Sequence, residues 1–268
     1  MPKRKNWDQA AGAIWPALTS AAAERNLLKY GEIAPLIPTN PLSVGRALGP
    51  IQSYCLDANI PPLTAIVVGK TTGLPGSGFV AWDIDNLEEG IEGVFRYPWD
   101  TIANPFTGFA DGTTEAGFAD ELVTYPDAAE GVYSRIKNRG VAQRVFRRAL
   151  LKAYDNKCCM CRLSFESALE AAHIVPWGES SPAERMDPRN GLLLCSTHHR
   201  MFDAAEITID INYKIEYFDP EGSDGPYSAA DHSLSISLHG STIRLPKKLD
   251  VAPSMFSVNR RRAMDEWE

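Results

Sequence analysis

Apolar residues recur at helical spacing in two parts of the chain. In residues 7–25, Ile14, Leu18 and Ala22 fall on one face, as they do in an amphipathic helix. Residues 141–154 repeat the pattern, with apolar side chains on one side and basic side chains on the other. We therefore expect two helices that each bury one face against the rest of the protein.

The stretch between these two helices combines helical and strand patterns. A short helix is expected to start near Gly31, and residues 43–54 form a longer helical pattern. Residues 63–68 and 79–82 are apolar runs on either side of a glycine-rich turn, which predicts a β-hairpin. Two helices followed by a hairpin is the order of a winged helix-turn-helix, in which the second helix contacts DNA.

The C-terminal part contains further strand patterns. Residues 207–218 alternate apolar and polar side chains, which predicts a hairpin with Asn212 at its turn. Residues 234–238 and 241–245 predict another pair of short strands, and residues 254–267 predict a terminal helix. With the helices upstream, these patterns predict an α+β protein.

The composition is that of an ordinary globular protein, with 44% hydrophobic and 23% charged residues. A length of 268 residues suggests two domains, which we expect to span residues 1–125 and 126–268. The sequence shows no apolar run long enough to cross a membrane and no apolar leader. We therefore expect a cytoplasmic protein that has no membrane partner.

The net charge of −7 conceals two segments of opposite charge. Residues 83–130 are acidic, with Arg96 as their one base, whereas residues 135–162 are basic, with Asp155 as their one acid. Binding of phosphate depends on the local field rather than on the net charge. The basic segment therefore predicts contact with nucleic acid. Its candidates lie on the polar side of the helix predicted over 141–154: Arg144, Arg147, Arg148 and Lys152.

Cysteine and histidine pairs follow the basic segment. Cys158 and Cys161 form a C-x-x-C pair, and Cys195 and His198 form a C-x-x-H pair. Two such pairs can supply the four ligands of a tetrahedral Zn²⁺ ion, because each pair fits on one tight turn. Cys159 lies between the ligands of the first pair, and the sequence leaves the register within C-C-M-C open.

Three further polar residues are not needed by a structural zinc site. His173 lies between the pairs, Asn190 opens an apolar run, and His199 follows the last zinc ligand directly. Taken singly, His173 has the pattern of a buried core histidine and Asn190-Gly191 that of a turn. Their combination favours a catalytic interpretation, since a neutral imidazole that titrates near about pH 6.5 can take a proton from water.

This combined segment, roughly residues 140–220, resembles an HNH nuclease of the ββα-metal family in the version that carries a zinc frame. The resemblance implies hydrolysis of phosphodiester bonds, with a structural Zn²⁺ and a catalytic Mg²⁺ or Mn²⁺. It implies that His173 on a strand is the general base and that Asn190 in a loop holds the histidine ring or the loop. It also implies that His199 on the following helix binds the catalytic metal.

One position departs from that family pattern. Many members have an aspartate directly before the catalytic histidine, where it binds the metal, and this chain has Ala172. The catalytic metal is then expected to use His199 with another oxygen donor, for which Glu170 and Asp203 are the nearest candidates. Water and substrate phosphate would complete the coordination of such a hard cation.

The N-terminal part carries a second resemblance. Its wording Y-G-E-I-A…V-G-R-A-L-G…P-L-T-A-I-V-V…G-S-G-F is similar to the winged-helix DNA-binding half of the alkylguanine alkyltransferases. Those proteins carry an alkyl-accepting cysteine in a P-C-H-R segment, whereas residues 64–66 here are Thr-Ala-Ile, so alkyl transfer is not expected. The resemblance implies that Arg46 and Gln52 of a recognition helix over 43–54 contact DNA. The alternative is that this domain packs on the nuclease or joins two subunits.

These observations predict a metal-dependent DNA endonuclease with an N-terminal winged-helix-like targeting domain and a C-terminal HNH domain. Restriction or defence against phage is the role that suits targeting and cutting in one chain. One such site cuts one strand, so a homodimer would cut both. Two alternatives remain: a zinc-stabilised DNA-binding or sensor protein with a degenerate nuclease site, and an RNA-directed nuclease.

Overall fold

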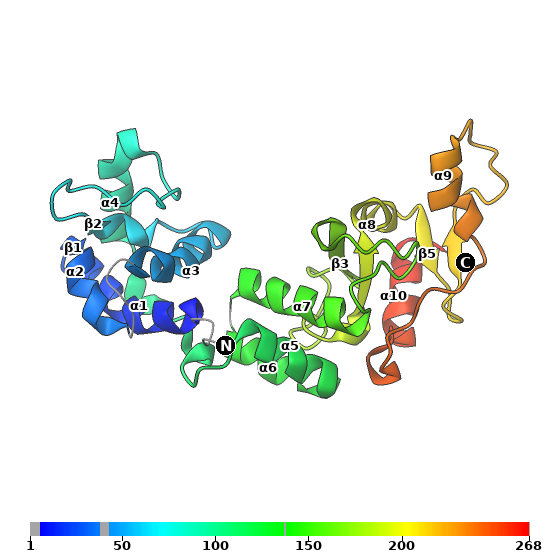
Figure 1. Ribbon diagram of the computed structural model, residues 1–268, viewed down its shortest axis with the longest axis horizontal. Coiled ribbons are helices and arrows are strands. Elements are labelled where there is room, and N and C mark those ends of the chain that lie inside the picture. Colours follow the sequence, from blue (N-terminus) through cyan, green and yellow to red (C-terminus); the bar gives the residue numbers. More distant parts are fainter. Residues whose placement is uncertain (1–5, 38–42, 137, 268) are drawn as a thin grey trace. The chain divides into compact units, whose positions relative to one another are not determined.

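The computed structural model describes residues 6–37, 43–136 and 138–267, which fall into two compact units (Figure 1). The first unit comprises Met1–Thr114 and Arg135–Ala142, and the second comprises Glu115–Ser134 and Gln143–Glu268. The expected boundary after residue 125 thus falls inside the second unit. No helix in the described ranges combines the length and the apolar character needed to cross a bilayer.

The first unit is built on α1 (Trp7–Ala23), which confirms the helix predicted there. The side chain of Asn6 caps this helix by accepting a hydrogen bond from the backbone N–H of Gln9 at 3.1 Å. Ile14 and Leu18 are fully buried, and this face of α1 packs against α3 (Val44–Asp57). The helical spacing of the apolar residues therefore identified the buried face correctly.

The two helices expected after α1 are also present. A single turn, α2 (Tyr30–Ile33), precedes α3, so the predicted order of a short and a longer helix is confirmed. The acidic segment contains a helix that the sequence patterns did not indicate, α4 (Leu87–Arg96). This helix packs against the buried turn Leu63–Ile66, with Val94 in the core.

The predicted hairpin of the first unit is wrong. Leu63–Ile66 forms a 3-10 turn that is buried on all sides, and β2 (Val67–Val68) pairs in parallel with β1 (Leu28–Lys29). Residues 79–82 form no strand. The reason is that the backbone N–H of Val80 donates to the side-chain oxygen of Gln52 at 2.9 Å, so α3 holds this segment. The winged-helix class therefore stays a prediction.

The second unit is organised around an antiparallel strand pair and one helix. β3 (Leu169–His173) pairs with β4 (Gly191–Cys195), and α8 (Ser196–Asp203) follows β4 without a break. In the register of this pair, His173 lies opposite Gly191. Figure 1 shows β3 and α8 close together in this unit. The chain thus forms the strand–strand–helix arrangement that the family resemblance implies.

The helix α7 (Arg139–Ala153) packs on this arrangement and confirms the helix predicted over 141–154. A Cβ atom at Gly191 would lie 2.6 Å from Cζ of Phe146 and 2.7 Å from Leu150, closer than such atoms approach. Glycine at this position is therefore required for α7 to lie against the start of β4. Two shorter helices, α5 (Glu115–Thr124) and α6 (Ala129–Ile136), precede α7.

The C-terminal elements agree only in part with their patterns. β5 (Ile207–Ile209) and β6 (Ile215–Tyr217) form the predicted hairpin, and α10 (Met255–Met264) is the predicted terminal helix. The strands predicted over 234–238 and 241–245 are wrong.

The first of these segments is helical because a capping box upstream starts α9 (Ala229–Leu234). In this box the Ser228 side chain accepts from the Asp231 N–H, and the Asp231 carboxylate accepts from the Ser228 N–H. The second segment contributes a single bridge, between Thr242 and Lys214.

Candidate functional site

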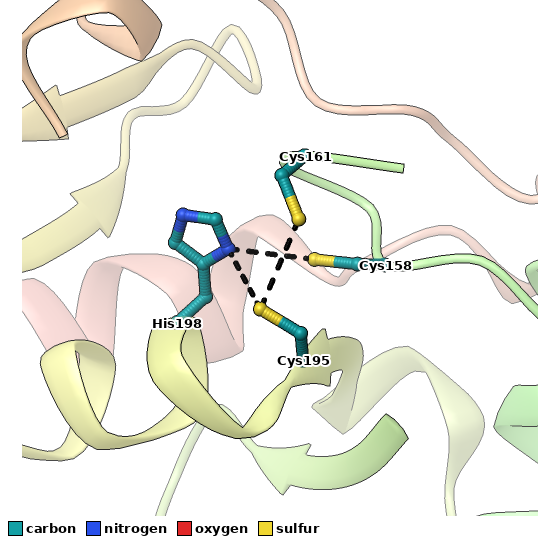
Figure 2. A group of neighbouring side chains, drawn as sticks. All are labelled: Cys158, Cys161, Cys195 and His198. Atoms are coloured by element: carbon teal, nitrogen blue, oxygen red, sulfur yellow. Dashed lines mark hydrogen bonds between the residues drawn. The ribbon is translucent and has the colours of Figure 1, made fainter. Parts of the chain in front are cut away.

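Three cysteines and one histidine converge in the second unit (Figure 2). The Sγ atoms of Cys158, Cys161 and Cys195 and a ring nitrogen of His198 all lie within 4.8 Å of one another. Cys158 and His198 are fully buried, and Cys195 is nearly so. The structure therefore brings together all four residues predicted as ligands.

The spacing of these atoms fits a tetrahedral zinc ion. Zn–S bonds of about 2.3 Å and a Zn–N bond of about 2.0 Å place sulfurs about 3.8 Å apart and sulfur and nitrogen about 3.6 Å apart. The Sγ atoms of Cys161 and Cys195 are 3.8 Å apart, and Sγ of Cys158 lies 3.6 Å from Nδ1 of His198. Three sulfurs and one imidazole are also a donor set that zinc prefers.

The proton on His198 is placed by a contact outside the cluster. Nε2 of His198 lies 2.9 Å from the carbonyl oxygen of Leu234, which only accepts hydrogen bonds, so Nε2 carries the proton. Nδ1 then directs its lone pair toward the sulfurs, as Figure 2 shows. Carbonyl contacts of this kind commonly fix the tautomer of a metal-binding histidine.

The cysteine cluster also favours the metal-binding form of Cys158. Hydrogen bonds from the neighbouring thiols of Cys161 and Cys195 lower the pKa of Cys158, which makes it a thiolate at neutral pH. Burial lowers the pKa of His198, but its contacts with the Cys158 and Cys195 sulfurs raise it overall, to about 10. These atoms compete for protons that a cation would displace.

The turn that carries Cys158 and Cys161 settles the register of C-C-M-C. The backbone N–H of Cys158 donates to the carbonyl of Leu163 at 2.9 Å, and Arg162 adopts a left-handed backbone with φ of 69°. Cys159 is buried in the hydrophobic core instead, and its N–H donates to the carbonyl of Leu193 on β4 at 2.8 Å. Cys159 is therefore not part of the cluster.

His173 ends β3 and is enclosed by aromatic rings. Its ring stacks on Phe146 with centroids 4.1 Å apart, and Trp177 meets it edge-on at 5.6 Å. Its Nε2 lies 3.0 Å from the carbonyl oxygen of Arg185, so Nε2 donates and Nδ1 keeps its lone pair. Burial lowers the pKa of His173, although the contact with the Arg185 carbonyl acts in the opposite direction. The imidazole is therefore neutral at neutral pH.

Asn190 holds the connection between β3 and β4. It is 1% exposed, and its Oδ1 accepts from the N–H of Val175 at 2.9 Å. Its Nδ2 donates to Oγ of Ser180 at 3.2 Å and to the carbonyl of Glu184 at 3.1 Å. Of the two roles expected for Asn190, these contacts match the one in which it positions the loop.

His199 on α8 lies between two carboxylates. Its Nδ1 is 2.5 Å from Oε2 of Glu170 on β3, and its Nε2 is 3.4 Å from Oδ2 of Asp203, one turn further along α8. The structure therefore brings together the three residues expected at the catalytic metal. Ala172, which replaces the aspartate of many family members, is fully buried.

Glu170 and His173 line one cavity of about 220 Å³ between β3 and α7. Gln143, Phe146 and Arg147 of α7 form its other wall. A carboxylate that contacts His199 and a neutral imidazole thus face the same small space, beside the cysteine cluster. A buried base next to an acidic donor is suited to activating a water molecule.

The basic side chains of α7 have partners within the second unit. Arg144 and Arg148 both pair with the Glu115 carboxylate of α5, at 2.7 and 3.1 Å, and Lys152 pairs with Asp120 at 2.6 Å. Arg147 donates instead to the carbonyls of Glu166 and Leu169, at 2.8 and 3.0 Å. It therefore holds the start of β3 in place. The role of these four residues in nucleic-acid binding stays a prediction.

Arg46 and Gln52 of α3 line a cavity of about 490 Å³ in the first unit. Gln52 binds the loop that follows, because its Nε2 donates to the carbonyl of Gly78 at 3.3 Å and its Oε1 accepts from Val80. Arg46 is exposed. Contact of either residue with DNA stays a prediction.

Comparison with known families agrees with the geometry. Residues 158–210 match the HNH endonuclease family, a segment that runs from the first cluster cysteine through β3, β4 and α8 to the end of β5. No curated protein matches the chain. The chain therefore carries an HNH endonuclease domain with a cluster suited to zinc, and such a domain implies a nucleic-acid substrate.

Several residues of the site were missed by the sequence analysis. Phe146, Trp177 and Arg185 all contact His173, and Tyr133 contacts Arg185. These residues come from α6, α7 and the loop after β3, and no periodic or motif spacing relates them to His173. Only the folded chain identifies them.

Proposed function

We propose that the chain is a divalent-metal-dependent DNA endonuclease in which His173 is the general base. The observation that supports this most is that His173 and Glu170 line one cavity while Glu170 contacts His199. A base and two metal donors are the groups that phosphodiester hydrolysis needs. All three come from one strand–strand–helix arrangement.

In this proposal His173 takes a proton from the attacking water at Nδ1. Its Nε2 already donates to Arg185, and no described residue makes a hydrogen bond to Nδ1. The lowered pKa keeps the ring neutral at the pH of the cell, so that it can accept this proton. Phe146 and Trp177 limit rotation of the ring.

Glu170 and His199 are the donors proposed for Mg²⁺ or Mn²⁺, and Asp203 is a third donor beside His199. A carboxylate with one imidazole suits a hard divalent cation that retains water and substrate ligands. Such an ion supplies charge neutralisation at the phosphoryl oxygens and assistance to the leaving oxygen. Glu170 would thus take the role of the aspartate that Ala172 replaces.

The N-terminal unit is proposed to select DNA through Arg46 and Gln52, and the basic face of α7 to contact phosphates near the site. The surface ion pairs of Arg144 and Arg148 are about half exposed, and exposed pairs contribute little, so DNA phosphates can replace Glu115. Restriction or defence against phage suits this combination of selection and cutting. A homodimer in the cytoplasm would cut both strands.

Cleavage of supercoiled plasmid in the presence of Mg²⁺ or Mn²⁺ tests the proposal. We expect nicking by the natural chain and its loss in His173→Ala, while His232→Ala, an exposed histidine on α9, cuts normally. Parallel digests of modified DNA, unmodified DNA and RNA define the substrate. Equal cutting by His173→Ala and the natural chain would disprove the role of His173, and cutting of RNA alone would disprove the DNA assignment.

A zinc-stabilised DNA-binding or sensor protein is the second candidate. The observation that favours it is that both ring nitrogens of His199 face carboxylates while Ala172 offers none. This candidate predicts DNA binding in gel-shift assays with no cleavage at any Mg²⁺ or Mn²⁺ concentration. Metal-dependent cleavage that His173→Ala abolishes would exclude it.

A further inference from the structure

The connection between β3 and β4 contains an arginine whose backbone and side chain both serve the histidine before it. The backbone carbonyl of Arg185 receives the hydrogen bond from Nε2 of His173 at 3.0 Å. Because a carbonyl oxygen only accepts, this contact selects the His173 tautomer with the proton on Nε2. The position of this one carbonyl therefore decides whether Nδ1 is available as a base.

The side chain of Arg185 fixes the position of its own carbonyl. Its Nε donates to the carbonyl of Trp177 at 3.1 Å, and its Nη1 contacts the hydroxyl of Tyr133 on α6 at 3.2 Å. The guanidinium also lies over both rings, 5.2 Å from the Trp177 centroid and 5.9 Å from the Tyr133 centroid. A planar guanidinium can donate in two directions and stack at the same time, which an ammonium cannot.

The same arginine connects to the aromatic enclosure of His173. Trp177, whose carbonyl and ring hold the guanidinium, meets the His173 ring edge-on at an interplanar angle of 87°. The backbone N–H of Arg185 donates to the carbonyl of Ser181 at 3.0 Å, and Asn190 holds the carbonyl of the preceding Glu184. The peptide that faces His173 is thus held from the loop, from α6 and from β4.

We infer that Arg185 is a positioning residue for His173. Its guanidinium, held by Tyr133 and Trp177, fixes the carbonyl that keeps the His173 proton on Nε2 and leaves Nδ1 free for water. This inference rests on the proposed function only for its consequence in catalysis. The positioning itself is a property of the folded chain.

Nitrogen-15 spectroscopy of the full-length, zinc-loaded protein tests the positioning without any need for activity. We expect the natural chain to show His173 in the Nε2–H tautomer. In Arg185→Met we expect a mixture of tautomers, and in Arg185→Lys, which keeps the charge but not the fork, a shift in the same direction. Tyr133→Phe, which removes one hydroxyl of the clamp, should produce a smaller shift.

Arg260 provides the matched control, because it also holds this loop, through Glu184 at 3.2 Å and the carbonyl of Glu179, without contacting the carbonyl at 185. Arg260→Met should leave the His173 tautomer unchanged. Zinc content and melting temperature identify any variant that fails to fold, and Arg185→Lys and Tyr133→Phe are the mild variants that keep the test available.

Steady-state cleavage then tests the catalytic consequence. We expect kcat to fall roughly 10- to 100-fold in Arg185→Met with KM for DNA unchanged, as for other residues that orient a catalytic group. An unchanged Nε2–H tautomer in both Arg185 variants would overturn the inference, and so would an equal effect of Arg260→Met. A tautomer shift together with an inactive natural chain would leave the positioning intact and reject the proposed function.

Discussion

Oε2 of Glu170 lies 2.5 Å from Nδ1 of His199, although the two residues are 29 positions apart in the chain. Glu170 is on β3 and His199 is on the first turns of α8, and the antiparallel pair β3–β4 brings them together. The cysteine cluster fixes the same helix through the adjacent His198. A zinc-held helix thus presents its next residue to a carboxylate on the facing strand.

Replacing the carboxylate of Glu170 by an amide should weaken the catalytic metal site. In Glu170→Gln we expect cleavage at limiting Mg²⁺ or Mn²⁺ to fall at least about 10-fold and to recover partly at high metal concentration, because a neutral amide is a weaker ligand. Cleavage rates over a metal titration measure this. Glu166→Gln, an exposed acid just before β3, is the control. A metal dependence unchanged from that of the natural chain would exclude Glu170 as a ligand.

The two adjacent cysteines should differ in their effect on zinc. Cys158→Ser should lose zinc and lower the melting temperature by more than about 5 °C, or more than about 2 kcal/mol, because the metal contributes to folding. Cys159→Ala should retain zinc, since Cys159 points into the core. Metal content by mass spectrometry and a thermal melt provide the comparison. Zinc lost equally from both variants would contradict the register seen in the structure.

The acid limb of the cleavage rate should lie below the ordinary titration range of histidine. Burial lowers the pKa of His173 from 6.5, so the folded protein resists protonation there more than the unfolded chain does. The stability from this group is therefore present above pH 6.5 and declines as the pH falls from 6.5 toward the folded-state value. A profile of kcat against pH at saturating metal should keep its plateau through pH 6.5. A limb centred above that pH would contradict the buried, neutral base.

Removal of the charge on Glu115 should strengthen binding of DNA. This carboxylate holds both Arg144 and Arg148, so Glu115→Gln leaves two guanidinium groups available to phosphates. We expect tighter binding and a salt dependence that is steeper by up to about 1.8 in the log–log slope, about 0.9 for each phosphate gained. Fluorescence anisotropy at several salt concentrations measures both quantities. The control is Glu130→Gln, which removes an exposed charge on α6; an equal gain in that variant would show a general charge effect only.

The limits of sequence reasoning are clearest where the backbone is held by a distant side chain. The apolar runs at 63–68 and 79–82 have the composition of paired strands, yet Gln52 binds the N–H of Val80 and β2 pairs with β1. Similarly, the basic face of α7 is visible in the sequence, but its pairing with Glu115 and Asp120 is not. These partners are chosen by packing between elements, which leaves no periodic trace.

The sequence alone determined the cysteine cluster, the helices with one apolar face and the strand–strand–helix order around His173. The physical reason is that each depends on local spacing: two ligands on one tight turn, or apolar residues at the period of a helix. Only the tertiary structure decided that Glu170 contacts His199, that Cys159 is excluded from the cluster and that Arg185 holds the proton of His173. Those contacts join residues whose separation along the chain is arbitrary, and the packing of α6, α7 and α8 against one strand pair brings them within hydrogen-bonding distance.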